Sequence, residues 1–85
     1  MKTIYKYKIE ETVLIPVDAI RVHTDTQGGE LYSWYLVDPD LPKETRHFRI
    51  VGTGHLIPSG YFHVATIKDT PFVWHVIESM YTESK

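Results

Sequence analysis

Hydrophobic and polar side chains alternate along several short segments of this chain, and a period of two is typical of half-buried β-strands. In the segment 3–9, for example, Tyr5, Tyr7 and Ile9 lie on one side and the lysines between them lie on the other. No stretch of ten or more residues carries a clear helical period. The segments that we expect to be strands are 3–9, 12–15, 19–25, 31–37, 45–51, 61–67 and 72–78.

Turn-forming residues separate these segments and set the expected fold. Gly28 and Gly29 predict a tight hairpin, because glycine adopts the positive φ angles that such turns require. The other links are also short, and short links favour antiparallel neighbours. We therefore expect residues 1–85 to form a single all-β domain, a small antiparallel sandwich or barrel of about seven strands. Residues 78–85 are expected to be a frayed tail.

Two of the expected strands, 31–37 and 72–78, are largely apolar on both faces. In the first of them, Tyr32, Trp34 and Leu36 alternate with a second set of apolar side chains. A large apolar surface is unusual on a monomer, so the pattern predicts a homo-oligomer. The alternatives are an aromatic face that binds a ligand, or a monomer with a second sheet on one face and a loop over the other.

Composition and charge narrow the classes of function. The chain has no cysteine, which excludes disulfides, thiolate nucleophiles and cysteine-based metal sites. Its formal net charge of −2 argues against nucleic acid or a membrane surface as a partner. No apolar run approaches the roughly 18 residues of a membrane span, and the first residues lack the apolar core of a signal peptide. We therefore expect a soluble cytoplasmic protein.

The polar residues form no recognisable catalytic or metal-binding motif. The histidines are His23, His47, His55, His63 and His75, and no two of them are two or four residues apart. His63 and His75 would meet across neighbouring strands only for one register of the turn between them. No serine lies between a strand and a helix, as a nucleophile elbow would require. Structural histidines are the favoured interpretation, and we expect no metal, no cofactor and no enzyme activity.

The most informative segment for binding runs from residue 44 to residue 55. Two arginines precede a Gly-Thr-Gly-His loop at 52–55. Consecutive loop N–H groups can bind an anion, glycine lets a phosphate approach closely, and the planar guanidinium suits phosphate. A tryptophan or a tyrosine, such as Trp34, Tyr35 or Trp74, would then stack on a nucleotide base. The candidate ligand-binding residues are Arg46, Arg49, Gly52, Thr53, Gly54, His55, Trp34 and Trp74.

This candidate site has a structural alternative. Arg46 and Arg49 point to opposite faces of a regular strand, so both serve one site only if the strand contains a bulge. The loop also lacks the lysine, the further glycine and the following helix of the common phosphate-binding motifs. The same residues would fit a surface strand that ends in a purely structural glycine turn.

The opening MKTIYKY and the blocks LVDPD, FRIVGTGH and FVWHV resemble an uncharacterised family of short phage-encoded proteins. The similarity spans nearly the whole chain, and residues 51–55 are its most specific block. The resemblance implies a phage context and assigns no catalytic residue. Because small phage proteins often inhibit host defence, the association suggests a non-enzymatic counter-defence binding protein in the cytoplasm of the infected bacterium.

Two kinds of partner and one structural role are compatible with a small phage protein of this composition. In its most concrete form, the protein is an oligomer that sequesters a phosphate-bearing nucleotide second messenger of immune signalling. The first alternative is direct inhibition of a host defence protein through protein–protein contacts. The second alternative is a small virion or assembly component.

Overall fold

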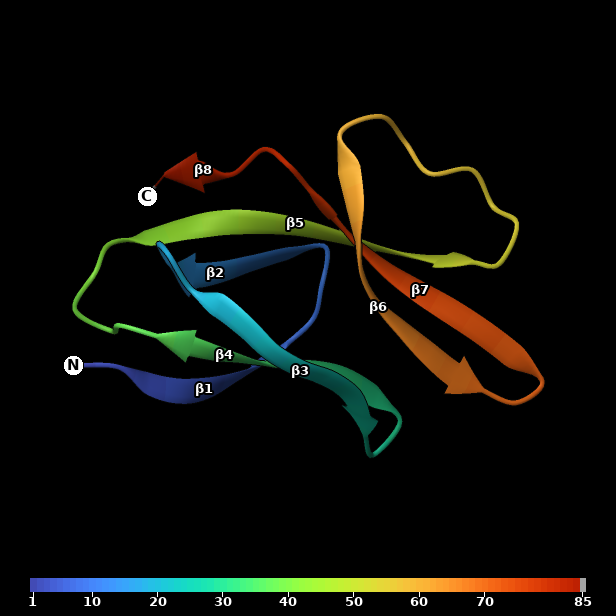
Figure 1. The fold of residues 1–85 in the computed structure, drawn as a ribbon, viewed down its shortest axis with the longest axis horizontal. Helices are drawn as coiled ribbons and strands as arrows, with labels where there is room; N and C mark the ends of the chain where they lie inside the picture. Colours follow the sequence, from blue (N-terminus) through green and yellow to red (C-terminus); the bar gives the residue numbers. More distant parts are fainter. Residues whose placement is uncertain (85) are drawn as a thin grey trace.

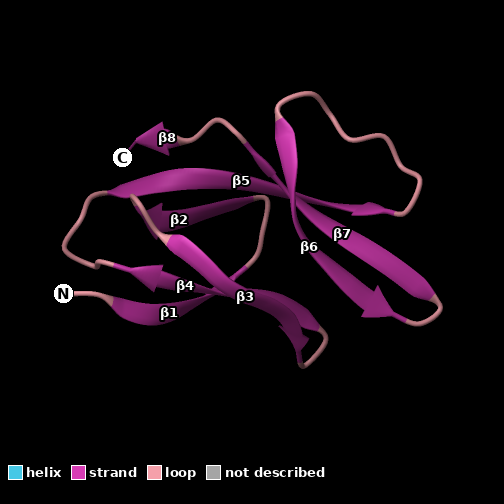
Figure 2. Ribbon diagram, in the orientation of Figure 1, coloured by secondary structure: helices cyan, strands magenta, loops and turns pink. Residues whose placement is uncertain are grey.

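The computed structural model describes residues 1–84, and these residues form an all-β structure without a helix. All strand pairs are antiparallel (Figures 1 and 2). Seven strands have five or more residues, as the alternation predicted, and an eighth has two. The strands are β1 (Thr3–Lys8), β2 (Thr12–Pro16), β3 (Ile20–Gln27), β4 (Glu30–Val37), β5 (Lys43–Gly52), β6 (Tyr61–Asp69), β7 (Phe72–Ser79) and β8 (Glu83–Ser84).

The strands form two sheets rather than a closed barrel. One sheet has the order β1-β4-β3, and the other has the order β2-β5-β7-β6 with β8 also paired to β5. The first half of β5 pairs with β2 and β8, and its second half pairs with β7. The Cα extents of 41 × 29 × 15 Å are those of a flat, two-layered sandwich.

The hydrophobic core lies between the two sheets. Tyr35 and Val37 of β4 pack in one cluster with Ile15 of β2, Phe48 of β5 and Val76 of β7, and each of the five is at most 2% exposed. All five lie on the side of their strand that faces the opposite sheet. Packing of the two sheets therefore follows from the alternation that identifies the strands.

The hairpin between β3 and β4 forms as predicted. Gln27 pairs with Glu30, which leaves a two-residue turn at Gly28 and Gly29. Their φ angles are 59° and 82°, in the left-handed region that a side chain rarely adopts. Two consecutive positive φ angles fit the type I′ turn, whose twist matches that of the paired strands.

The C-terminal segment differs from the predicted frayed tail. Strand β7 continues to Ser79, and both Glu78 and Ser79 are buried. Beyond it, β8 pairs with the first half of β5, while residue 85 lies outside the described residues. The prediction was wrong because tertiary pairing, which local composition does not report, orders this end of the chain.

The two strands predicted to be apolar on both faces are covered differently. On β7, Val76 faces the core, while Ile77 on the other face is fully buried within the chain. On β4, one face forms the core and the other remains half-buried. Of these two strands, β4 is therefore the one that keeps a partly exposed apolar face. Among the described residues, no helix is long and apolar enough to cross a membrane.

We expect Ile15→Ala to lower the free energy of unfolding by about 2–5 kcal/mol, because it leaves a cavity at a fully buried position between the sheets. Urea denaturation monitored by circular dichroism measures this change. Leu14→Ala on the same strand is the control, since Leu14 is 47% exposed and its loss should cost less. Equal losses at the two positions would contradict the assigned inward face of β2.

Candidate functional site

A β-bulge in β6 organises the outward-facing surface of the larger sheet. His63 pairs with Ile77 and Ala65 with Val76, so Val64 is an extra residue in β6. In a regular strand, residues three apart point to opposite faces. The bulge reverses this relation, and His63 and Thr66 lie on the same face as His75 of β7.

Four side chains on this face form a continuous hydrogen-bonded chain. The hydroxyl of Thr53 lies 3.0 Å from Nε2 of His75, and the hydroxyl of Thr66 lies 3.2 Å from Nδ1 of the same ring. The Thr66 hydroxyl is also 3.0 Å from Nε2 of His63. The two imidazole rings have their centroids 5.5 Å apart. A hydroxyl group both donates and accepts hydrogen bonds, so the chain is compatible with either tautomer of each histidine.

The Gly-Thr-Gly-His loop folds back on itself at the end of β5. The backbone N–H of Gly52 donates to Nδ1 of His55 at 3.2 Å, and the N–H of His55 donates to the Gly52 carbonyl at 3.2 Å. A Cβ atom on Gly52 would lie 3.2 Å from Cε1 of His55, so the ring packs directly on this glycine. Gly54 has φ 88°, which a side chain would strain. The N–H of Gly52 is thus engaged by His55 within the loop.

The loop, β6 and β7 together enclose a hollow of about 280 Å³. The connection from β5 to β6, which contributes to the lining of this hollow, lies at the end of the molecule opposite both termini (Figure 1). None of the described residues that line the hollow carries a carboxylate. They are Val51, Gly52, Thr53, Gly54, His55, Ile57, His63 and His75.

Arg49 extends this surface along β5. Arg49 pairs with Ile77 and Val51 pairs with His75, so Arg49 lies on the same face one pair further from the loop. Its guanidinium carbon is 5.4 Å from the centroid of the Tyr61 ring, and the side chain is exposed. We call the surface formed by Arg49, His55, His63 and His75 the histidine face.

The other three candidate residues lie elsewhere. Trp34 lies on the outward face of the smaller sheet, 5.6 Å from the ring of His23. Trp74 faces the space between the sheets and stacks on Phe72, with ring centroids 5.7 Å apart. Arg46 also faces inward, since a regular strand places it opposite to Arg49. The structure therefore places Arg49 on the same face of β5 as Val51, which leads to the loop, but places neither tryptophan nor Arg46 there.

Arg46 belongs to a buried polar cluster between the sheets. Its Nε is 3.3 Å from a Glu44 carboxylate oxygen, and one terminal nitrogen donates to the Ala19 carbonyl at 3.1 Å. The other terminal nitrogen is 3.9 Å from Glu78. Breaking such a pair would leave a buried charge without its partner, so Arg46 acts within the fold rather than as a free phosphate ligand.

Burial also raises the pKa values of two groups at this cluster, Glu78 and Tyr35. Burial raises the pKa of the Glu78 carboxyl, and the nearby Arg46 guanidinium opposes this rise only in part. Burial likewise raises the pKa of Tyr35 to about 12. Among the described residues, the Tyr35 hydroxyl has no hydrogen-bond partner. The cluster is thus a polar region that the fold tolerates at a cost.

Comparison with known proteins places the chain in a family without assigning it a function. A family model described as a domain of unknown function, DUF7352, matches residues 1–85. The chain belongs to this DUF7352 family. No curated protein and no solved structure matches the chain. Its chemistry must therefore be inferred from its own residues.

The histidine face could be predicted only in part from the sequence. The loop and Arg49 were predicted to lie together, but the meeting of His63 and His75 depended on a register that the sequence left open. Thr66 was missed, because the bulge that turns it onto this face leaves no local signal. Within residues 1–84, no group of three or more histidine or carboxylate side chains is arranged to hold a metal ion.

We expect the pH dependence of stability to reveal the buried Glu78 carboxyl. A pKa raised on folding means that this group favours the folded state when protonated, and that contribution is lost as the pH rises through the folded-state pKa. The free energy of unfolding of the wild type should therefore fall relative to that of Glu78→Gln as the pH increases from about 4 to about 7. Urea denaturation across this range measures it.

Glu10→Gln, at an exposed carboxyl, is the control for the loss of one charge. The difference in the free energy of unfolding between wild type and Glu10→Gln should not fall in the same way as the pH increases. A constant difference between wild type and Glu78→Gln, or one of the opposite slope, would contradict the assigned direction.

Proposed function

We propose that this protein is a non-enzymatic binding protein that sequesters a phosphate-bearing nucleotide on its histidine face. We further propose that the nucleotide is an immune signal and that the protein acts in the bacterial cytoplasm during phage infection. The phage context rests on the resemblance of the MKTIYKY, LVDPD, FRIVGTGH and FVWHV blocks. The class of ligand rests on the chemistry of the face itself.

The observation that carries the proposal is that three histidines line a hollow whose lining holds no carboxylate. His55, His63 and His75 lie there, and Arg49 lies on the same face of β5, one strand pair away. A guanidinium offers forked donors to phosphate oxygens, and a protonated imidazole adds charge-assisted donors. Hydrogen-bond donors without a carboxylate in the lining of the hollow favour an anionic ligand.

The hydrogen bonds of the loop and the positions of the two tryptophans alter the binding mode that we expect for a phosphate and a base. Because the Gly52 N–H already donates to His55, side chains rather than a fully free loop would supply most of the donors. Neither tryptophan lies on this face, so stacking of a base would fall to Tyr61 or to an imidazole ring. The Thr53 and Thr66 hydroxyls add neutral donors and acceptors that fit ribose or phosphate oxygens.

We expect Arg49→Ala to weaken nucleotide binding by about ten- to 150-fold, the range of one charge-assisted hydrogen bond. Arg49→Lys should recover only part of the affinity, because an ammonium lacks the fork. A thermal-shift panel of nucleoside mono-, di- and triphosphates, cyclic dinucleotides and inorganic pyrophosphate selects the probe. Isothermal titration calorimetry with that probe then measures the affinities.

Arg21→Ala is the matched control, because it removes the exposed arginine of β3 on the other sheet. It should leave the affinity unchanged. Equal affinity of folded Arg49→Ala and wild type for the selected probe would overturn the assignment, as would the absence of stabilisation by any anion in the panel.

We also expect Gly52→Ala to weaken binding severalfold while the fold is retained. The added Cβ would meet the His55 ring at 3.2 Å and displace it from the hollow, whereas the φ angle of Gly52 lies outside the left-handed region. Calorimetry with the same probe measures the loss, and thermal melting checks the fold. Gly28→Ala is a control that strains a distant turn instead. Unchanged affinity of Gly52→Ala for the probe would show that the position of His55 does not affect binding.

A further inference from the structure

The outward face of the smaller sheet is an unpartnered surface on the opposite side of the sandwich from the histidine face. We call it the β4 face, because Tyr32, Trp34 and Leu36 of β4 run along its centre. The pairing of β1 and β3 with β4 arranges it in three rows. The rows are Ile4–Leu36–Ile20, Lys6–Trp34–His23 and Lys8–Tyr32–Asp25.

One half of this face is apolar and exposed. Ile4 is 54% exposed and Ile20 is 58% exposed, on either side of Leu36. A bulge in β3 adds Val22, which is 54% exposed, next to this row. Trp34 is half-buried beside it. A contiguous apolar patch of this kind on a small protein marks an interaction surface.

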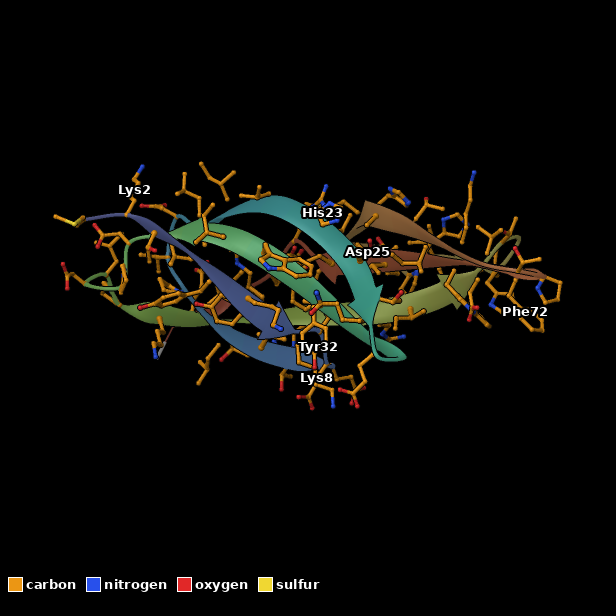
Figure 3. All side chains as sticks on the ribbon, turned by 90° about the horizontal axis from the view of Figure 1, so that it is seen from below. Lys2, Lys8, His23, Asp25, Tyr32 and Phe72 are labelled. Atoms are coloured by element: carbon orange, nitrogen blue, oxygen red, sulfur yellow. The ribbon has the colours of Figure 1, made fainter. Side chains whose placement is uncertain are left out.

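The other half of the face is charged, and its two edges differ in sign. Lys6 and Lys8 lie on β1, whereas Asp25 lies on β3. Figure 3 shows Lys8 beside Tyr32, with His23 and Asp25 along β3 at the opposite edge of this sheet. The existing partners of these charges are exposed: Lys8 is 3.3 Å from Glu30, and Asp25 is 3.6 Å from His23. Exposed pairs like these are weak and can be exchanged.

We propose that a second copy of this chain covers the β4 face, through a two-fold axis that lies in the interface and runs parallel to β4. Rotation about this axis keeps each row at its own level and places β1 of one protomer over β3 of its partner. Ile4 then faces Ile20, Lys8 faces Asp25, and the β4 residues face their own copies. The same patch meets itself in such an isologous dimer.

This orientation of the axis is favoured because apolar residues then meet apolar residues and Lys8 meets Asp25. A two-fold axis across the strands at the centre of the face would place the isoleucine row over the Lys8–Tyr32–Asp25 row. If this axis lay at the apolar end instead, only the apolar ends of the two faces would overlap. The axis along β4 pairs Ile4 with Ile20 and Lys8 with Asp25, while Lys6 faces His23. Only three strands contribute, so the interface is smaller than the roughly 800 Å² per partner of standard complexes. Interfaces of this size are typical of weak, transient complexes, so we expect a reversible dimer.

Charge reversal tests the proposal through complementation. Lys8→Asp alone places two carboxylates at each former Lys8–Asp25 contact, and Asp25→Lys alone places two ammonium groups there. Each variant should dimerise at least tenfold more weakly than the wild type. An equimolar mixture should form a heterodimer, because both contacts then join opposite charges. Sedimentation equilibrium from about 5 to 200 μM measures the mass against the 9.9 kDa of one chain.

The design separates the interface from folding and from ligand binding. A folding defect of either variant would persist in the mixture, so restored association cannot arise from repair of the fold. Lys68→Asp on β6 reverses a charge away from the β4 face and should dimerise as the wild type does. Both monomeric variants should keep the nucleotide affinity of the wild type, so this proposal and the proposed function can fail separately.

Two results would overturn the proposal. A wild-type mass of one chain throughout the concentration range would show that no second copy covers this face. A dimeric wild type whose two charge variants also dimerise separately, or fail to associate when mixed, would place the interface elsewhere.

Discussion

Strand β5 is the element on which the rest of the structure depends. Its first half pairs with β2 and β8, and its second half pairs with β7, so one ten-residue strand joins both ends of the larger sheet. Its alternating side chains also divide the chemistry of the molecule. Phe48 and Arg46 face the space between the sheets, while Arg49 faces outward with Val51 toward the glycine loop. The core, the buried ion pairs and the histidine face are thus positioned by the same backbone ladder.

Two β-bulges create the surfaces on which the proposals rest. In β6, the bulge at Val64 turns His63 and Thr66 to the same face, where both approach His75. In β3, the bulge between Arg21 and His23 adds an exposed valine to the apolar half of the β4 face. Each bulge adds one residue to a strand and so changes which side chains share a face. The two surfaces lie on opposite sides of the sandwich, and occupation of one leaves the other accessible.

Charged side chains lie between the two sheets, next to the small hydrophobic core. Glu44, Arg46 and Glu78 occupy inward positions between the sheets. The raised pKa values of Glu78 and Tyr35 show that their charged forms are disfavoured there. Apolar burial elsewhere, at Ile15 and Phe48 for example, must offset this cost. Arg46 is therefore better explained by the architecture than by ligand binding.

The sequence by itself determined the number, type and approximate limits of the seven main strands and the position of the Gly28–Gly29 turn. These features are local, because strand alternation repeats every two residues and a tight turn is specified by the residues within it. Only the tertiary structure decided that Arg46 is buried, that His63 meets His75, and that the C-terminal residues pair with β5. Each of these depends on pairing between distant segments, and a shift of one residue reverses the face of every side chain that follows. Tertiary pairing thus decided which of the predicted side chains lie on the histidine face.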